Sequence, residues 1–304
     1  MIPISPYFGK TFENKEILSK IDRILIKLRR KPFIMPEKNS SVILIASGGL
    51  DSVSLWLMLL KKYRLRVYPI YFDNGNRSQK ESVVYYDSIF KKTYPDRSLS
   101  LTTVKKPYPE YKNYIKKDIF SKLDGQFILA NLVFNRDLGK KGVLIPGAPT
   151  RLFYFNVFAF EFAHLLRIRS GEKIDTVFTG IVPDDSLTRR ESTLTTIRAI
   201  NLATILIFGN ENWQCQAPLD KKNSFYFSKK DLVRYALKNG LDLRKTWSCD
   251  RRGKYQCGAC PSCFARKKVF KELKIIDPTI YKTPLLESLK NKVKSLLKIK
   301  RKFK

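Results

Sequence analysis

Short apolar runs of strand length alternate along the chain with longer segments of helical pattern. Val and Ile concentrate in the short runs, which is typical of buried strands, whereas the longer segments are apolar throughout or carry apolar residues at helical spacing. The pattern predicts strands at residues 42–46, 67–72, 143–145 and 175–179. It predicts helices at residues 15–30, 52–63, 151–166, 189–208 and 228–239.

The repeated order of strand, loop and helix, with short links, predicts parallel strands joined by right-handed crossovers. We therefore expect an α/β fold with a doubly wound parallel sheet, in which ligands lie beyond the carboxyl ends of the strands. Ser228 and Gly240 are good capping residues for the last predicted helix. Residues 73–81 read as a polar turn, and the polar segment 98–141 gives no clear prediction.

Composition suggests four regions in the 304 residues. They are a basic N-terminal extension (1–40), a main domain (41–248), a cysteine-rich segment (249–273) and a basic C-terminal tail (274–304). No stretch reaches the roughly 18–20 uninterrupted apolar residues of a membrane span, and the first residues lack the basic and apolar regions of a secretory signal. We expect a cytoplasmic protein without a membrane span.

The charge balance is strongly basic, with 59 Lys and Arg against 27 Asp and Glu and a formal net charge of +32. Such a field attracts polyanions, so a nucleic acid or an acidic protein is a candidate partner for the basic surface and tails. The codon bias of an A+T-rich genome explains the same excess of lysine without any partner. The sequence leaves both explanations open.

A glycine-containing motif, SGGLDS, joins the first predicted strand of the main domain to its helix. It lacks the lysine of the Gly-Lys-Ser/Thr nucleotide loop, but its backbone N–H groups at a helix N-terminus suit a phosphate or pyrophosphate. The aspartate would repel that group unless a cation such as Mg²⁺ lay between them. A purely structural turn is the alternative. The residues concerned are Ser47, Gly48, Gly49, Leu50, Asp51 and Ser52.

Four of the five cysteines are clustered within 15 residues, at Cys249, Cys257, Cys260 and Cys263. Four thiols at this spacing match the ligands of a closed structural Zn²⁺ site, and an iron–sulfur cluster is the rival assignment. A closed site leaves no open coordination position, so we assign this metal no catalytic role. Cys215 lies outside the cluster, and we expect it to be a small buried hydrophobic residue.

The SGGLDS motif resembles the PP-loop of the ATP pyrophosphatase superfamily, a HUP/Rossmann-like fold whose members split ATP between the α and β phosphates. Residues 246–270 (TWSCDRRGKYQCGACPSCFARKKVF) resemble the C-terminal zinc segment of the QueC family, the 7-cyano-7-deazaguanine synthases. Four other stretches match that family in order: IYFDNGNRSQKE, IPGAPTRLFYFNVFAFEFA, FTGIVPDDSLTRRESTL, and APL with SKKDLVRYALKNGLDLRKTWSC. The resemblance covers roughly residues 42–272.

The resemblance implies an ATP-dependent ligase that adenylates 7-carboxy-7-deazaguanine and then aminolyses the acyl-adenylate with ammonia, ending in the nitrile. It implies that the motif residues cradle pyrophosphate, that Asp51 and Lys229 are catalytic, and that Phe72 contributes to the nucleotide site. Arg151, Asp184, Asp185 and Arg189 are the candidate residues for the substrate. A surface lysine and a turn-forming pair of aspartates are the plain alternatives for Lys229 and for residues 184–185. Family members are often dimers, so a homodimer is expected.

The stretches expected to contact the substrate depart from the family pattern. The family's Gln-Arg-His is here Asn76-Arg77-Ser78, an asparagine after Pro146-Gly147 is missing, and SLTRRES replaces SGYPDC. A diverged enzyme that passes the activated group to an amine on a protein or nucleic acid, as in an antiviral defence system, is therefore a second hypothesis. A tRNA-thiolating enzyme of the same superfamily is a third, and a nucleotide-binding module that has lost catalysis is a fourth.

Overall fold

The computed structural model describes residues 11–105, 151–187, 189 and 191–282. Within them, five parallel strands form one sheet in the order β3-β2-β1-β4-β5. A separate antiparallel hairpin pairs β6 (Leu219–Asp220) with β7 (Phe225–Tyr226). The strands of the sheet are β1 (Ser41–Ile45), β2 (Arg66–Asp73), β3 (Thr102–Lys105), β4 (Thr176–Thr179) and β5 (Gln214–Gln216).

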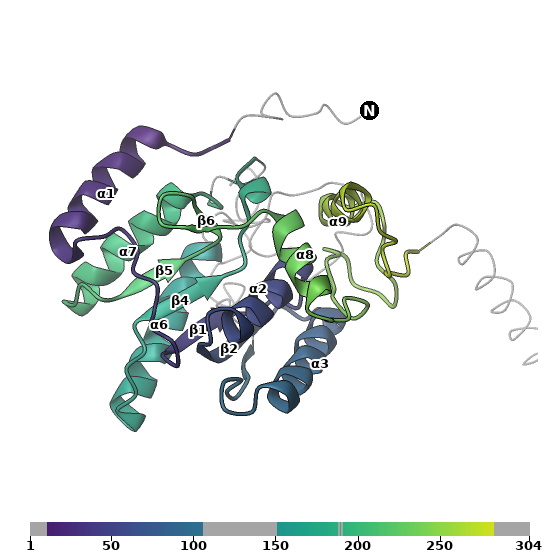
Figure 1. The fold of residues 1–304 in the computed structure, drawn as a ribbon, viewed down its shortest axis with the longest axis horizontal. Helices are drawn as coiled ribbons and strands as arrows, with labels where there is room; N and C mark the ends of the chain where they lie inside the picture. Colours follow the sequence, from purple (N-terminus) through teal and green to yellow (C-terminus); the bar gives the residue numbers. More distant parts are fainter. Residues whose placement is uncertain (1–10, 106–150, 188, 190, 283–304) are drawn as a thin grey trace, which may run out of the picture.

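Helices cover both faces of this sheet (Figure 1). One face carries α2 (Leu50–Lys61), α3 (Arg77–Thr93), α8 (Lys229–Lys238) and α9 (Pro261–Glu272). The other face carries α6 (Arg151–Ser170) and α7 (Leu194–Phe208), and α1 (Lys15–Arg29) packs on the outside of α7. The doubly wound parallel architecture expected from the sequence is confirmed.

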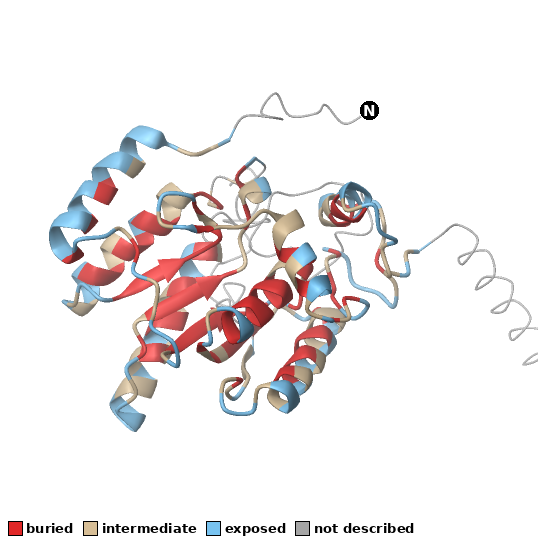
Figure 2. Cartoon of the chain, in the orientation of Figure 1, coloured by how far each residue is buried: buried red, intermediate tan, exposed pale blue. Residues whose placement is uncertain are grey.

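Strand β1 is buried along its whole length because it lies between the two helical layers (Figure 2). Its side chains alternate, with Val42 and Leu44 in the apolar cluster beneath α2 and α8, and Ile43 and Ile45 in the cluster beneath α6 and α7. Burial on both faces explains why the strand reads as a continuous apolar run instead of an alternating one. The strand order reverses between β1 and β4, which is the position where α/β sheets form a ligand crevice.

Several elements differ from the sequence prediction. α2 begins at Leu50, and α7 begins at Leu194 after its N-cap Thr193, so residues 189 and 191–193 lie before the helix instead of forming its first turn. The predicted polar turn at 73–81 contains the start of α3, whose N-cap Asn76 accepts a hydrogen bond from the Gln79 N–H at 3.4 Å. The start of α3 was not predicted because its residues are polar, and the same is true of the short strands β3 and β5. The strand predicted at 143–145 lies outside the described residues.

The predicted helix at 228–239 is confirmed as α8, with Ser228 and Asp231 forming a reciprocal capping box. None of the helices that the structure describes has both the length and the apolar character of a membrane span. Residue 274 and the few residues after it that are described pack near α9, and the basic tail beyond residue 282 lies outside the described residues.

Candidate active site and metal centre

The loop that joins β1 to α2 is held in one backbone conformation. Gly48 has φ of +72°, and a Cβ at this position would lie 2.7 Å from the carbonyl oxygen of Gln79, so only glycine fits. Its own carbonyl oxygen accepts two hydrogen bonds of 2.8 Å, from the Ser82 hydroxyl and from the Trp247 backbone N–H. These two donors fix the orientation of the peptide that follows Gly48, at the N-terminus of α2.

Two serine hydroxyls of the same loop face each other. The Oγ atoms of Ser47 and Ser52 lie 3.0 Å apart, and Ser52 Oγ also accepts from the Ser47 N–H at 3.2 Å. Gly180, directly after β4, approaches so closely that a Cβ there would lie 2.9 Å from the Ser52 Cα atom. The loop therefore lies in the crevice between β1 and β4, and Gly180 forms part of its wall.

A buried ion pair joins this loop to the start of α8. The Lys229 ammonium contacts Asp51 Oδ2, and the two side chains are only 12% and 18% exposed. Asp51 Oδ1 is buried and has no hydrogen-bond partner among the described residues. The prediction that both residues belong to one site agrees with this placement, because 178 positions of sequence separate two atoms that are in contact.

The charges around this pair are unbalanced. Burial alone would lower the pKa of Lys229, but the carboxylates of Asp51, Asp185 and Asp184 outweigh it and raise that pKa, so the ammonium is charged at neutral pH. Burial raises the pKa of Asp51, and Asp185 and Asp184 add to the shift while Lys229 opposes it. Three carboxylates thus share one ammonium, and this excess of negative charge suits a divalent cation with oxygen ligands.

The two neighbouring aspartates lie in a short 3₁₀ turn, Pro183–Leu187, after β4. Asp185 accepts a hydrogen bond from the Val182 N–H at 3.0 Å, whereas Asp184 is exposed. Further along this loop, Arg189 donates its backbone N–H to the Asp185 carbonyl at 3.0 Å. Desolvation raises the pKa of Asp250, and the charge of Arg189 partly opposes that shift, so the Arg189 guanidinium is near enough to the cysteine-rich segment to interact with it electrostatically.

The other predicted site residues lie on the opposite side of the sheet. Phe72, at the end of β2, is 5% exposed and stacks on Phe155 of α6 with ring centroids 4.0 Å apart and planes 6° apart. Phe158 meets it edge-on, so the described contacts of Phe72 are those of a core residue. Arg151 is the first residue of α6. A nucleotide contact by Phe72 and a substrate contact by Arg151 stay predictions.

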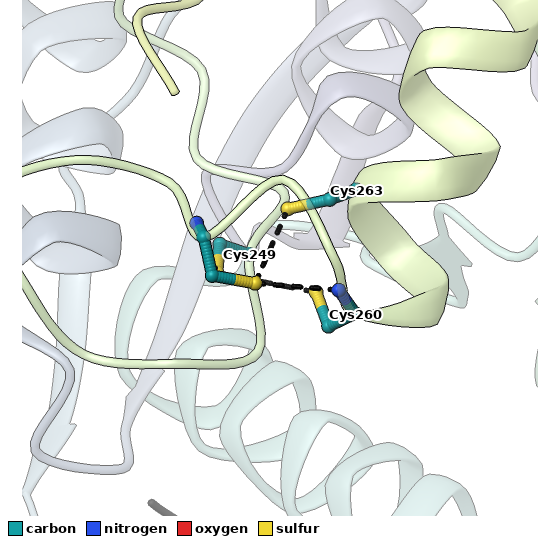
Figure 3. A group of neighbouring side chains, drawn as sticks. Cys249, Cys260 and Cys263 are labelled. Carbon is teal, nitrogen blue, oxygen red and sulfur yellow. Dashed lines mark hydrogen bonds between the residues drawn. The ribbon is translucent and has the colours of Figure 1, made fainter. Parts of the chain in front are cut away.

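The four clustered cysteines converge on one point. Figure 3 shows three of them, Cys249, Cys260 and Cys263, with their sulfur atoms turned toward one another. Their Sγ atoms all lie within 4.8 Å of one another, and two of the pairs, Cys249–Cys260 and Cys257–Cys263, are 3.9 Å apart. A tetrahedral Zn²⁺ site with Zn–S bonds of about 2.3 Å has S···S edges of about 3.8 Å. The described geometry therefore fits a metal ion held by four thiolates.

Backbone N–H groups point at the sulfur atoms, as expected around thiolates. Cys249 Sγ accepts from the N–H groups of Arg251 and Cys257, both at 3.3 Å. Cys257 Sγ accepts from Ala259 at 3.4 Å and from Cys260 at 3.3 Å. Such donors stabilise negative charge on sulfur, which metal ligation requires.

The metal centre is directly connected to the loops of the ion-pair site. Trp247, which donates to Gly48, also donates its indole N–H to the Cys249 carbonyl at 2.9 Å. The Arg252 guanidinium donates to the Asn74 carbonyl at 3.2 Å, and the Ser78 hydroxyl donates to the Gly253 carbonyl at 2.8 Å. The cysteine-rich segment thus packs against the SGGLDS loop, the loop after β2 and the first turn of α3.

Sequence reasoning missed the residues that make these long-range contacts, namely Gly180, Ser82, Trp247 and Arg266. Arg266 of α9 is 1% exposed and pairs with Asp277 at 3.1 Å, while it also donates to the Leu243 carbonyl at 3.2 Å. Two of these residues stand at positions that the sequence could have drawn attention to: Gly180 follows a predicted strand, and Trp247 precedes Cys249 by two residues. The sequence does not indicate which distant residues they contact.

Comparison with known proteins agrees with this geometry. The family model for "Queuosine biosynthesis protein QueC" matches residues 41–274. The 7-cyano-7-deazaguanine synthase of Nautilia profundicola is 26% identical over 244 residues, covering 79% of this chain and 97% of that protein. The synthase of Campylobacter fetus is 34% identical over 112 residues, covering 37% of this chain and 48% of that protein.

Among solved structures, the chain is similar to the U34-tRNA thiolase NcsA from Methanococcus maripaludis with its [4Fe-4S] cluster. The TM-score is 0.35 at 13% identity, covering 84% of this chain and 73% of that one, and a likeness at this level carries no argument about function. The family model, in contrast, spans the whole sheet, the SGGLDS loop and the four cysteines. The chain belongs to the QueC family of ATP-dependent PP-loop ligases.

Proposed function

We propose that this protein uses ATP to activate the carboxylate of 7-carboxy-7-deazaguanine and converts it into 7-cyano-7-deazaguanine. A carboxylate oxygen attacks the α phosphorus of ATP, the bond to the bridging oxygen breaks, and pyrophosphate leaves. Ammonia then attacks the acyl carbon, a proton is lost, and AMP departs to leave the amide. A second ATP activates the amide oxygen in the same way, and loss of AMP and a proton gives the nitrile. The name of the relatives supports this reaction.

The observation that carries the proposal is the buried contact between Asp51 and Lys229 at the PP-loop. Backbone N–H groups at the start of α2 and the hydroxyls of Ser47 and Ser52 form the cradle for pyrophosphate. The charged Lys229 ammonium stabilises the negative charge that grows on the α phosphate and on the leaving group. Lys229 acts in this way because three carboxylates hold it protonated.

The same carboxylates fit a Mg²⁺ ion. Asp51 offers an unpartnered buried oxygen, and Asp184 and Asp185 lie near enough to influence it electrostatically. A bound Mg²⁺ would neutralise phosphate charge and would separate the phosphates from these carboxylates. We assign Asp51 as a ligand, with Asp184 and Asp185 as residues that hold the ion or accept hydrogen bonds from the guanine-like edge of the substrate. Arg189, Arg151 and Phe72 complete the proposed site for substrate and nucleotide.

The proposed role of the cysteine cluster is structural Zn²⁺ binding. Four thiolates fill a tetrahedral site and leave no position for a substrate. A thiolation that passes through a cysteine persulfide needs a reactive cysteine besides the metal ligands, and Cys215 is the one other cysteine in the sequence. It is fully buried, its thiol donates to Asn156 Oδ1 at 2.7 Å, and burial raises its pKa. These features argue against a tRNA-thiolating enzyme that uses a cysteine persulfide.

A second candidate function is transfer of the activated deazaguanine to an amine on a protein or a nucleic acid, in an antiviral defence system. Two observations favour it: the net charge of +32, which suits a polyanionic acceptor, and the divergence of the substrate loop at SLTRRES. Both candidates share the adenylation step and differ only in the amine. The proposed setting for either is the cytoplasm, with a homodimer as the proposed assembly.

One experiment separates the candidates. The purified protein is incubated with ATP, Mg²⁺ and 7-carboxy-7-deazaguanine, with and without ammonia, and small molecules and co-purified macromolecules are examined by mass spectrometry. We expect AMP and pyrophosphate in stoichiometric amounts and, with ammonia, the nitrile. An adduct on a macromolecule, with no nitrile, would instead support the second candidate. Absence of AMP under both conditions would refute both.

A further inference from the structure

A short segment that precedes α1 contacts the loop carrying the predicted substrate residues. The Phe12 N–H donates to the Ser186 carbonyl at 3.1 Å, and the hydroxyls of Thr11 and Ser186 lie 3.2 Å apart. Ser186 follows Asp185 directly and is 9% exposed. The N-terminal segment therefore touches the 3₁₀ turn itself, within one residue of a carboxylate that influences Lys229.

The same segment also caps the helix that ends this loop. The Glu13 carboxylate accepts from the N–H groups of Leu194 and Thr195, both at 2.8 Å, and from the Thr195 hydroxyl. The N-cap Thr193 accepts from the Thr196 N–H at 3.2 Å. The first three amides of α7 are thus satisfied, two of them by a residue about 180 positions away, and a carboxylate at a helix N-terminus also interacts favourably with the helix dipole.

The segment is held in place because α1 is anchored to the rest of the protein along its length. Asp22 pairs with the fully buried Arg198 of α7 at 3.1 Å, and Leu25 packs with Ile205. At the end of the helix, Arg29 donates to the Trp213 carbonyl at 3.1 Å. Residues 11–13 are therefore tied to a fixed helix, and they hold both ends of the intervening loop.

We propose that residues 11–13 are a positioning element for the loop at 183–193, with Glu13 as its main residue, and that they set the affinity for the non-nucleotide substrate. This inference rests on the proposed function, in which that loop contacts the deazaguanine. The segment lies outside the family match at 41–274, and the loop it holds is one of the stretches whose sequence departs from the family pattern. Both facts are explained if the N-terminal segment stabilises a loop whose sequence differs from that of the family.

The first test measures the support itself and needs no substrate. Hydrogen–deuterium exchange is compared in the full-length protein, Glu13→Ala, Glu13→Gln and the control Glu16→Gln. Glu16 is 77% exposed and pairs only with Lys20 among the described residues. We expect exchange at residues 183–195 to accelerate about fivefold or more in Glu13→Ala, the size of effect that follows loss of a helix cap, and less in Glu13→Gln, which keeps one acceptor oxygen. Unchanged exchange in Glu13→Ala would overturn the inference.

The second test measures the consequence for the reaction, as pyrophosphate release at varied substrate and varied ATP. We expect Glu13→Ala to raise KM for 7-carboxy-7-deazaguanine about fivefold or more and to leave KM for ATP within about twofold, while Glu16→Gln changes neither. Equal rises in both KM values would show general destabilisation and would overturn the inference. If the wild-type protein does not adenylate this substrate, the proposed function fails, and the exchange experiment still decides whether Glu13 holds the loop.

Discussion

At the scale of single residues, the proposed chemistry depends on a few side chains whose environment changes their properties. Lys229 is one of many lysines in a very basic chain, yet it is buried in contact with Asp51, and the charges of Asp51, Asp185 and Asp184 raise its pKa against the effect of burial. Asp51 keeps one buried oxygen without a partner among the described residues. The same residue types on the surface would be ordinary solvated charges, so burial and proximity distinguish them.

Replacing Lys229 with alanine should slow adenylation strongly while leaving much of the fold intact. Loss of a preorganised positive charge from a phosphoryl-transfer site costs about 10²-fold or more in rate. AMP formation would be measured together with the thermal midpoint of unfolding. Lys238→Ala, at the exposed end of the same helix, is the matched control and should retain wild-type activity. A Lys229→Ala enzyme with near wild-type turnover would remove Lys229 from the mechanism.

Replacing Gly180 with alanine should weaken ATP binding. The added Cβ would lie 2.9 Å from the Ser52 Cα atom, so the first turn of α2 must shift. We expect KM for ATP to rise about tenfold, because displacement of a binding group by a fraction of an ångström is enough to disturb a preorganised site. Gly171→Ala is the control for a general loss of stability, since its φ of +66° strains an alanine while no atom lies within 4 Å of the added Cβ. Equal effects of the two substitutions on ATP binding would contradict the proposed crevice.

At the scale of elements, the cysteine-rich segment and the PP-loop form one connected unit. Trp247 donates to the Gly48 carbonyl and to the Cys249 carbonyl, so a metal ligand lies two residues from a PP-loop contact. The cysteine-rich segment therefore supports the PP-loop through direct hydrogen bonds. Its packing against the loop after β2 extends this support to a second edge of the site.

Removing the metal should consequently weaken nucleotide binding. We expect one Zn²⁺ per chain by elemental analysis, no visible absorption band of an iron–sulfur cluster, and an ATP Kd that rises about fivefold or more after chelation, the effect of one lost hydrogen bond. Calorimetric titration with ATP would measure the Kd. Ser82→Ala removes the other donor to the Gly48 carbonyl and should produce a similar change with the metal in place. An unchanged Kd in both proteins would contradict the coupling.

The end of the sheet far from the active site also depends on one carboxylate. Glu172 accepts hydrogen bonds from Ser41, from Tyr68 at 2.5 Å and from Arg66 at 2.6 Å. Burial would raise its pKa, but these partners together lower it. The stabilisation is therefore present above the ordinary glutamate pKa and is lost as the pH falls through the lowered value.

Glu172→Gln should accordingly reduce the free energy of unfolding by about 2 kcal/mol at pH 7, the usual size for hydrogen bonds to a charged group. The difference from wild type should shrink as the pH drops below the unfolded-state value near 4.5. Urea unfolding at several pH values measures it, and Glu37→Gln, at an exposed position, serves as control. A difference that stays constant down to pH 3 would contradict the assignment.

At the scale of the whole molecule, features that depend on a local sequence pattern could be predicted, whereas features that depend on contacts between distant residues could not. The apolar strand β1, the glycine motif and the cysteine spacing are local signals. They predict, in turn, a buried strand of an α/β sheet, the turn from that strand into α2, and a group of four thiols that could hold a metal. The short polar strands β3 and β5 were missed because their partners, not their own side chains, stabilise them. The capping of α7 by Glu13 escaped prediction for the same reason, since about 180 residues separate Glu13 from the amides that it accepts from.

The central claim, that a substrate carboxylate attacks the α phosphorus of ATP, is tested most directly by following oxygen. Substrate labelled with ¹⁸O in its carboxylate is incubated with the protein, ATP, Mg²⁺ and ammonia, and the nucleotide product is examined by mass spectrometry. The account predicts that AMP formed in the first activation carries one ¹⁸O atom from the carboxylate, since that oxygen leaves with the phosphate when the amide forms. Unlabelled AMP, or ADP as the nucleotide product, would contradict it.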